Sequence, residues 1–369
     1  MIVRKNSFVC LVSSATAIIV LGCSRNATTE NMYMTTDSII YAHDFPIKYQ
    51  LQEPSEFSQE IIGIKSFCIL DTVLAFTLKG TDQVVDFFST GGDELGRFMS
   101  IGDGPQDLIE HPNFNTNTDF YKEKGKRYVL FYDTQKGRML KMDVDSSILE
   151  KSLRIKEVMS DLSNSLFTIK KGGGDTYFCK ELNDDATNQI RYLLKNGKRK
   201  ETKILAKLNQ ANVPEGEDFN ILSALTKIHG DKVVEAPIGL NYMNLYSIED
   251  SFAVTICMDK ELSNINEIIK QNEAERLYTF ANVQVYDSFW GVVYIGEEEK
   301  TYQLSRKKKP AIYLFDWEGK PLAEIKLNRH ITSFDIDFNH GELYTLDVHT
   351  DEFLKYDIRN LLYELSKAN

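Results

Sequence analysis

Acidic and histidine side chains with metal-ligand spacing occur near the C-terminal end of the chain. Asp347, His349 and Asp351 alternate, and Asp335 and Asp337 lie just upstream. Carboxylates and imidazole can together hold a divalent cation. In the internal repeat described below, only the first position of the alternating triplet is acidic in both copies. The sequence therefore favours a turn-capping role for Asp347 and predicts no bound metal and no cofactor.

A glycine-rich segment is the second candidate for chemistry. Gly102-Asp103-Gly104-Pro105 could bring backbone N–H groups close to an anion, but the Lys-Ser/Thr of a P-loop is absent, no helical run follows, and Pro105 removes a donor. The pattern favours a tight turn between two repeat units. It also leaves open a ligand-contacting loop, so these four residues are the predicted binding positions.

Sequence motifs of hydrolases are not found. None of the six histidines lies in a His-Glu-x-x-His pattern, and no serine lies in Gly-x-Ser-x-Gly. Propeller enzymes can assemble their sites from distant segments. We predict no catalytic residues, and an enzyme that uses scattered carboxylates such as Asp335, Asp337 and Asp347 stays open as an alternative.

The N-terminal segment has the features of a lipoprotein signal. Arg4 and Lys5 precede an apolar run over residues 8–21, which ends at Gly22-Cys23. The run is shorter than the roughly 20 residues that span a bilayer, which disfavours a transmembrane anchor. We predict a signal peptide over 1–22, lipidation (palmitate) at Cys23, a flexible tether over 23–37 and a single folded domain over 38–369.

Charge and cysteine content restrict the possible partners. Loss of Arg4 and Lys5 with the signal leaves 41 basic against 54 acidic residues, a formal charge of −13 that disfavours nucleic acid. Besides Cys23, the segment after the signal contains Cys68, Cys179 and Cys257 in apolar runs, which predicts buried thiols and no disulfide framework.

An internal repeat indicates the fold. Residues 130–144 align without a gap with residues 344–358, and both copies read as two short strands joined by a polar turn. The earlier copy is expected to turn at 145–147 and to continue as a further antiparallel strand through 148–155. After Ile358 the spacing of Leu361, Leu362 and Leu365 is instead helical.

Six strand-rich units follow one another along the chain. They span residues 61–98, 120–155, 166–205, 221–258, 277–327 and 331–358, with a polar connector over 206–219 and a short helix expected within 260–276. Asn196-Gly197 is a hairpin signal in the third unit. About four short strands per unit predict an all-β, six-bladed β-propeller.

The last unit lacks an outer strand, which leaves an open sheet edge. Residues 38–51 alternate apolar and polar side chains around Pro46, which confines a strand there to an edge position. We therefore expect an N-terminal strand within 38–51 to close the last blade.

With these features the chain resembles the six-bladed, TolB-like propeller lipoproteins of Bacteroidetes. The resemblance rests on the signal at Cys23, the blade pattern, and the run from Ile101 to Asp107 followed by His111-Pro112. In the corresponding loop the family more often has Glu where this chain has Gln106 or Asp107. The resemblance implies a cell-envelope location, expected at the outer membrane, and a binding role without assigned catalytic residues.

The resulting expectation is a lipid-anchored envelope protein that binds a polymer, peptide, glycan or protein without catalysis. The alternatives are an envelope enzyme, such as a metal-assisted hydrolase or lactonase in the propeller funnel, and a structural scaffold for a larger envelope complex. The basic run 306–309 is expected in a solvated loop, with contact to anionic headgroups as the other possibility. Five aromatic residues are candidates for sugar stacking if they reach the central face: Trp290, Trp317, Tyr242, Tyr246 and Tyr286.

Overall fold

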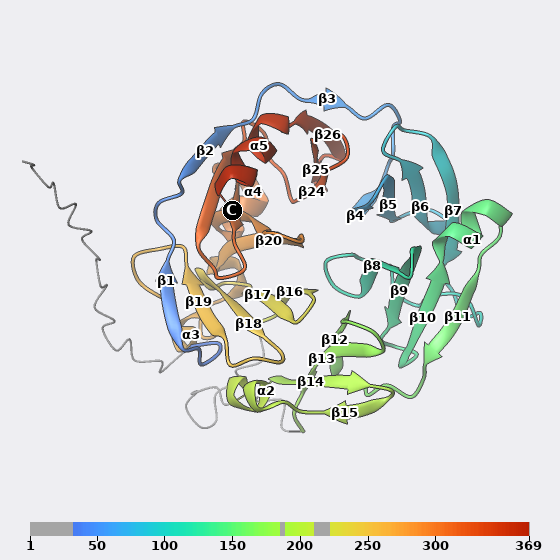
Figure 1. The fold of residues 1–369 in the computed structure, drawn as a ribbon, viewed down its shortest axis with the longest axis horizontal. Coiled ribbons are helices and arrows are strands. Elements are labelled where there is room, and N and C mark those ends of the chain that lie inside the picture. The colour runs from blue at the N-terminus through green and yellow to red at the C-terminus, as the bar shows by residue number, and fades with distance from the viewer. Residues whose placement is uncertain (1–31, 185–188, 210–221, 369) are drawn as a thin grey trace, which may run out of the picture.

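Six small sheets arranged around a central axis form the protein. The structure is a computed structural model, and it describes residues 32–184, 189–209 and 222–368. Viewed down the axis, the sheets form a ring in which the innermost strands are β4, β8, β12, β16, β20 and β24 (Figure 1). The predicted all-β, six-bladed propeller is confirmed.

Within each blade, successive strands pair antiparallel from the centre outwards. Blade 1 contains β4 (Ile64–Leu70), β5 (Val73–Leu78), β6 (Gln83–Ser89) and β7 (Glu94–Ser100). Blade 2 contains β8 (Thr118–Glu123), β9 (Lys126–Asp133), β10 (Arg138–Asp143) and β11 (Ile155–Met159). Blade 3 contains β12 (Leu166–Lys171), β13 (Thr176–Leu182), β14 (Gln189–Lys195) and β15 (Lys198–Lys200).

The other three blades each take an additional strand from the N-terminal segment. Blade 4 contains β16 (Ala224–His229), β17 (Lys232–Pro237), β18 (Tyr242–Ser247) and β19 (Ala253–Cys257). Blade 5 contains β20 (Leu277–Val285), β21 (Trp290–Glu298), β22 (Ala311–Phe315) and β23 (Pro321–Lys326). Blade 6 contains β24 (Ser333–Asp337), β25 (Glu342–Asp347) and β26 (Glu352–Asp357).

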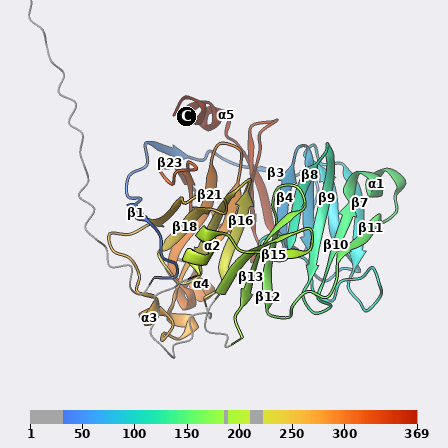
Figure 2. The same ribbon diagram turned by 60° about the horizontal axis from the view of Figure 1, so that its bottom comes forward.

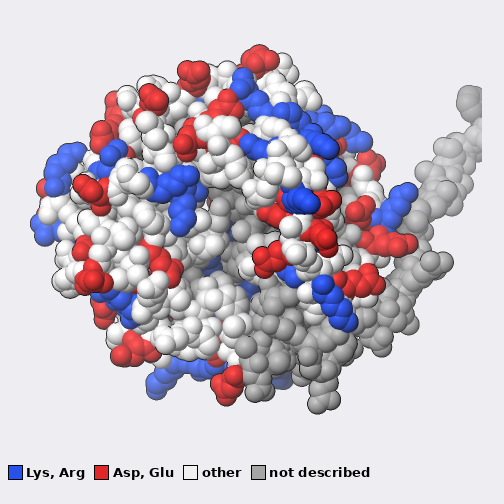
Figure 3. Space-filling model, turned by 180° about the vertical axis from the view of Figure 1, so that it is seen from behind, with Lys and Arg blue, Asp and Glu red and all other residues white. Residues whose placement is uncertain are grey.

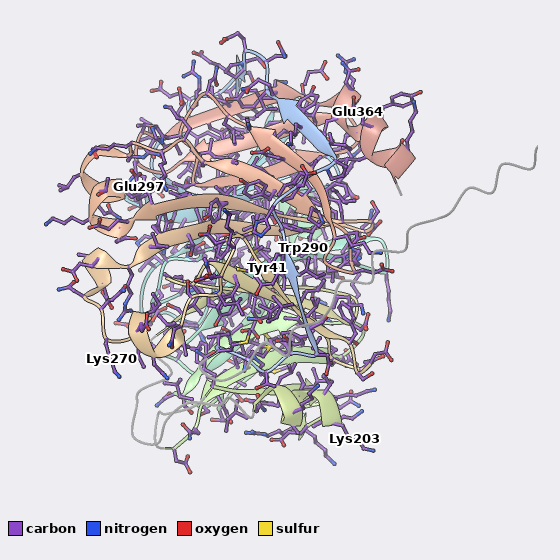
Figure 4. The ribbon with its side chains drawn as sticks, turned by 90° about the vertical axis from the view of Figure 1, so that its left-hand side faces the viewer. Tyr41, Lys203, Lys270, Trp290, Glu297 and Glu364 are labelled. Atoms are coloured by element: carbon purple, nitrogen blue, oxygen red, sulfur yellow. The ribbon has the colours of Figure 1, made fainter. Side chains whose placement is uncertain are left out.

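Residues 32–57, which we call the belt, cross the outer edges of blades 4, 5 and 6 in that order (Figure 1). Strand β1 (Ser38–Tyr41) pairs parallel with β19, and β2 (Ile47–Gln50) pairs parallel with β23. Strand β3 (Ser55–Glu56) pairs antiparallel with β26. Figure 4 shows the belt from outside, with Tyr41 on it.

The belt corrects one prediction about closure. An N-terminal strand does close the last blade, but it is β3, whereas the predicted residues 38–51 form the outermost strands of blades 4 and 5. Alternation of apolar and polar residues indicates a strand but does not determine which strand it pairs with. Part of the predicted tether is also packed: Met32, Tyr33 and Met34 are buried. Cys23 and the rest of the tether lie outside the described residues.

Two segments predicted as strands are helical because side chains cap their first turns. Helix α1 (Val144–Glu150) occupies the expected turn and strand after β10, with Asp143 accepting the Ser146 N–H. Helix α2 (Lys203–Leu208) begins after Thr202, whose hydroxyl accepts the Leu205 N–H. The strand that follows α1 is β11, and β15 precedes residues 202–205, where the sequence pattern predicts the fourth strand of the third unit.

The other helices lie in connections between strands or at the C-terminal end. The helix expected within 260–276 is present as α3 (Ile265–Ile268) and the short 3-10 turn η2 (Glu273–Glu275). Helix α4 (Glu299–Ser305) follows β21, and α5 (Arg359–Ala368) follows β26, as the leucine spacing predicts. Within the described segments, none of the helices has the length and apolar character needed to cross a membrane.

The repeat and the hairpin signal are confirmed by strand register. Residues 130–144 and 344–358 supply the second and third strands of blades 2 and 6, with Asp133 opposite Arg138 and Asp347 opposite Glu352. Asn196 and Gly197 both have positive φ, 50° and 71°, as a two-residue type I′ turn requires.

Candidate functional site

The inner strands of all six blades line a cavity on the propeller axis, which we call the funnel. Its volume is about 810 Å³, within the usual range of ligand sites. The lining residues come from the last part of each inner strand and from the turn that follows, except that β8 lines it along most of its length. The funnel therefore lies towards the face that carries the turns between first and second strands. Helix α5 starts on the same face, because the Ile358 N–H donates to Gly341 O in the β24–β25 turn (Figures 1 and 2).

The inner end of the funnel is closed by the connection between blades 1 and 2. Phe114 lines the cavity, and its N–H donates to Ser66 Oγ at 2.9 Å. Its carbonyl accepts from Lys227 Nζ at 2.8 Å, and neighbouring Asn115 accepts from Asn282 at 2.8 Å. These bonds join the connection to inner strands of blades 1, 4 and 5, so it forms the floor of the funnel.

Two lysines lie at this floor. Lys170 is 2% exposed, and its Nζ is 2.9 Å from Asp119 Oδ1; burial lowers the pKa of this lysine and Asp119 opposes the shift. Within the part of the chain that the structure describes, no carboxylate lies within ion-pair distance of Lys227 Nζ. An ammonium group with one carbonyl partner retains hydrogen atoms for a ligand acceptor.

The opposite wall of the funnel contains the carboxyl group of Asp335, which accepts three hydrogen bonds. Asp335 accepts the Ile69 N–H and the Ile336 N–H, both at 2.8 Å, and the Tyr286 hydroxyl at 3.0 Å. Burial raises the pKa of Asp335, and these donors oppose the shift. Burial, followed by the Asp335 charge, raises the pKa of the nearby Cys68 thiol. A protonated thiol is a poor nucleophile, so this wall offers recognition groups and no activated nucleophile.

Aromatic side chains surround the funnel mouth at blades 4 to 6. Phe338 is 49% exposed, and its ring lies 5.1 Å from that of Tyr286. Trp317 donates to Tyr286 O and stacks on His229 with a centroid distance of 5.5 Å. Of the five aromatic candidates, Tyr286 lines the funnel and Trp317 borders it; Trp290, Tyr242 and Tyr246 are buried in the core.

The predicted Gly102–Pro105 loop lies elsewhere, between β7 and β8. Lys136 Nζ donates to the Gly102 and Gly104 carbonyls at 3.1 Å each, and Arg138 donates to the Pro105 carbonyl at 2.8 Å. Because these backbone carbonyls accept hydrogen bonds from Lys136 and Arg138, the loop is poorly suited to bind an anion through its backbone. Its contacts are those of a turn held between blades, while a ligand role for Gly102, Asp103, Gly104 and Pro105 stays a prediction.

The acidic residues considered as metal ligands do not converge. Asp335 faces the funnel, while Asp337 accepts the Asn339 and His340 N–H groups in the β24–β25 turn. Asp347 is at the other end of β25, bonded to Arg306 and to the His349 N–H. Over residues 32–184, 189–209 and 222–368, no three His, Cys, Asp or Glu side chains form a group suited to a metal ion.

A second polar cluster, which we call the Glu235 cluster, is fully buried between blades 3 and 4. Glu235 accepts from Arg191 Nε at 2.7 Å, Lys180 Nζ at 2.9 Å and the Tyr33 hydroxyl at 3.1 Å, and also from the Tyr246 hydroxyl. Burial alone would raise the pKa of Glu235, but Arg191 and Lys180 outweigh it and hold that pKa well below its usual range. Because Tyr33 belongs to the belt, the cluster joins the belt to two blades and is structural.

Sequence reasoning identified Asp335 and Tyr286 but missed the funnel lysines. Lys170, which Lys171 follows directly, and Lys227 lie in short strands and belong to no recognised motif. Aligning the six inner strands by their ends would have found them, since the positions near the end of each strand face the axis.

No protein-family model and no curated protein matches the chain. The solved structures that match it do so at low sequence identity and low TM-score. A DUF4221-family protein from Bacteroides vulgatus is 13% identical, with a TM-score of 0.46, over 84% of this chain and 94% of that one. The AfRom2 CNH domain is 8% identical, with a TM-score of 0.36, over 82% of this chain and 87% of that one. The tricorn protease is 13% identical, with a TM-score of 0.34, over 76% of this chain but 28% of the protease.

Proposed function

We propose that the chain is a lipid-anchored binding protein of the bacterial cell envelope, at the outer membrane, related to the TolB-like propeller lipoproteins. It takes part of a polymer, peptide, glycan or protein partner into the funnel and performs no catalysis on it. The lipid signal ending at Cys23 supports the location. The observation that carries the binding role is the funnel itself, which has lysines at its floor and, at its mouth, aromatic side chains that include the exposed Phe338.

The contacts in the funnel favour binding over catalysis. Burial raises the pKa of the Cys68 thiol, and Asp335 accepts hydrogen bonds from two N–H groups and a hydroxyl. The metal-dependent enzyme considered from the sequence drew on Asp335, Asp337 and Asp347; Asp337 is bonded within the β24–β25 turn, and Asp347 lies at the other end of β25. Lys227 and Phe338 remain available to contact a ligand.

Site-specific photo-crosslinking in the native envelope tests the proposal. A photoreactive amino acid at Phe338 should give a discrete crosslinked partner, because this side chain is exposed at the funnel mouth. The same amino acid at Leu149 is the matched control, since Leu149 is 83% exposed on α1 at the outside of blade 2. Identical adducts from both positions, or none from position 338, would contradict a binding role for the funnel.

Two further measurements then distinguish a binding protein from the enzyme alternative. Lys227→Met should weaken capture of that crosslinked partner, whereas alanine at Asp337 and His349 together should leave capture intact, because neither side chain lines the funnel. Stoichiometric zinc, iron or manganese in purified protein that disappears, together with a hydrolytic activity, when alanine replaces Asp335, Asp337 and His349 would favour the enzyme.

A further inference from the structure

A second cleft lies at the seam between blades 5 and 6, on the face opposite the funnel mouth. Its volume is about 770 Å³, and its walls come from the belt, the β21–β22 and β23–β24 connections and the β25–β26 turn. Basic residues gather over these two blades on the face shown in Figure 3. The fold therefore brings together the basic run 306–309 and the Asp347 turn, two sequence features that the funnel does not use.

Two of the three acidic side chains that line the cleft are engaged by arginines, and the third, Glu53 of the belt, is exposed. Asp347 Oδ2 lies 2.6 Å from Arg306 Nη1, and Glu352 Oε1 lies 2.6 Å from Arg329 Nη1. Asp347 is 3% exposed and also accepts the His349 N–H, so it acts as an internal partner that orients Arg306.

The cleft retains buried nitrogen atoms without a partner. Arg306 Nε and Nη2 and His330 Nδ1 are inaccessible to solvent, and in the described part of the chain no group meets hydrogen-bond geometry with any of them. The Arg306 guanidinium packs 5.4 Å from the centre of the Tyr302 ring, which fixes its plane. Unmatched buried polar atoms cost free energy, and an oxyanion that reaches Arg306, whose side chain is 16% exposed, would remove part of that cost.

The electrostatic environment matches such a ligand. Lys309 is exposed at the cleft and, within the described residues, forms no ion pair with an acidic side chain. Burial lowers the pKa of His330, and the charges of Lys309 and Arg306 lower it further. A guanidinium and an ammonium beside it are groups that recognise oxyanions.

We propose that this cleft is an oxyanion site that binds a phosphate group through Arg306 and Lys309, with His330 as an additional donor. The phosphate belongs either to a soluble ligand or to an anionic lipid headgroup. The site is separate from the funnel and does not rest on the function proposed for it.

Calorimetric titration of the protein with inorganic phosphate at low ionic strength tests the site. Arg306→Lys retains the charge opposite Asp347 but loses the guanidinium fork, and Lys309→Gln removes an exposed charge. Each should weaken phosphate binding about tenfold or more. Lys320→Gln is the matched control, because Lys320 is a 67% exposed lysine in blade 5 at the β22–β23 turn, on the other face.

The outcomes decide both the site and the source of the phosphate. Saturable binding weakened by Arg306→Lys and Lys309→Gln but unchanged in Lys320→Gln supports the proposal. No binding, or binding that neither of these two variants alters, overturns it. If Arg306→Lys lowers the unfolding temperature, Lys309→Gln decides alone.

Vesicle sedimentation then distinguishes the sources, with phosphatidylglycerol vesicles compared with phosphatidylcholine vesicles. The wild type and Lys309→Gln carry the same N-terminal segment, so the difference between them reports the cleft. A loss of phosphatidylglycerol binding in the variant identifies a headgroup, and an unchanged vesicle result with weakened phosphate binding identifies a soluble ligand.

Discussion

Replacing Glu235 with glutamine should cost far more stability than removing a surface carboxylate. Glu235 is fully buried, as are its charged partners Lys180 and Arg191, which are 0% and 1% exposed. Glutamine keeps the shape of the side chain, removes the negative charge and directs an amide donor at groups that are themselves donors. Breaking a buried ion pair by removing one partner costs about 3–5 kcal/mol.

Urea denaturation followed by circular dichroism measures this cost as a change in the free energy of unfolding. Glu318→Gln is the control, because Glu318 pairs with Lys320 on the surface, where both side chains are about two-thirds exposed, at 68% and 67%. The control should unfold at the same urea concentration as the wild type, since exposed pairs contribute little.

A double-mutant cycle identifies the cause of the loss. If the cost arises from an unpaired buried lysine, Lys180→Met should be less damaging in the Glu235→Gln background than in the wild type, with a coupling of about 1–3 kcal/mol. A loss below about 1 kcal/mol for Glu235→Gln, or additive effects in the cycle, would refute the reasoning.

Three other variants test the closure, the anchor and the pH response. Phe57→Ala should destabilise the protein by about 3–5 kcal/mol, because Phe57 packs among aromatic rings that join blades 6 and 1. Phe338→Ala at the funnel mouth is the control and should unfold like the wild type. Equal urea midpoints for the two variants would contradict a role of Phe57 in closing the ring between blades 6 and 1. Cys23→Ala should abolish incorporation of a fatty-acid probe, and continued labelling would contradict lipidation at this residue. Burial lowers the pKa of Lys180 to about 8, below the roughly 10.4 of an unfolded chain. Between these values the unfolded state binds more protons, so the free energy of unfolding of the wild type, measured relative to Lys180→Met, should rise with pH; a flat or falling difference from pH 8 to 10 would count against the assignment.

Local patterns in the sequence determined the architecture well and long-range partners poorly. Alternation, turn residues and the repeat at 130–144 and 344–358 depend on neighbours along the chain, and they predicted the blades. The partner of each belt strand depends on which sheet edge the chain passes, which alternation does not encode. Helices α1 and α2 were missed because Asp143 and Thr202 look like turn or strand residues until their capping bonds are seen.

The candidate sites were harder to predict for the same reason. The second cleft, proposed to bind phosphate, combines Arg306 with His330 and the Asp347 turn between blades 5 and 6. The funnel floor combines Lys170 and Lys227, which belong to adjacent blades. No spacing in the sequence relates these residues. What brings them together is the ring, in which equivalent positions of different blades meet.

The order of the belt along the chain has a mechanical consequence. Any pull from the N-terminal side reaches Tyr33 and then β1 before it reaches β3, the short strand that completes blade 6. Tyr33 is held by a buried carboxylate, and β1 runs alongside β19, so tension along the belt must shear several hydrogen bonds together. Strand β3 has only two residues, and its position after β1 and β2 shields it from a force applied at the N-terminal end of the belt.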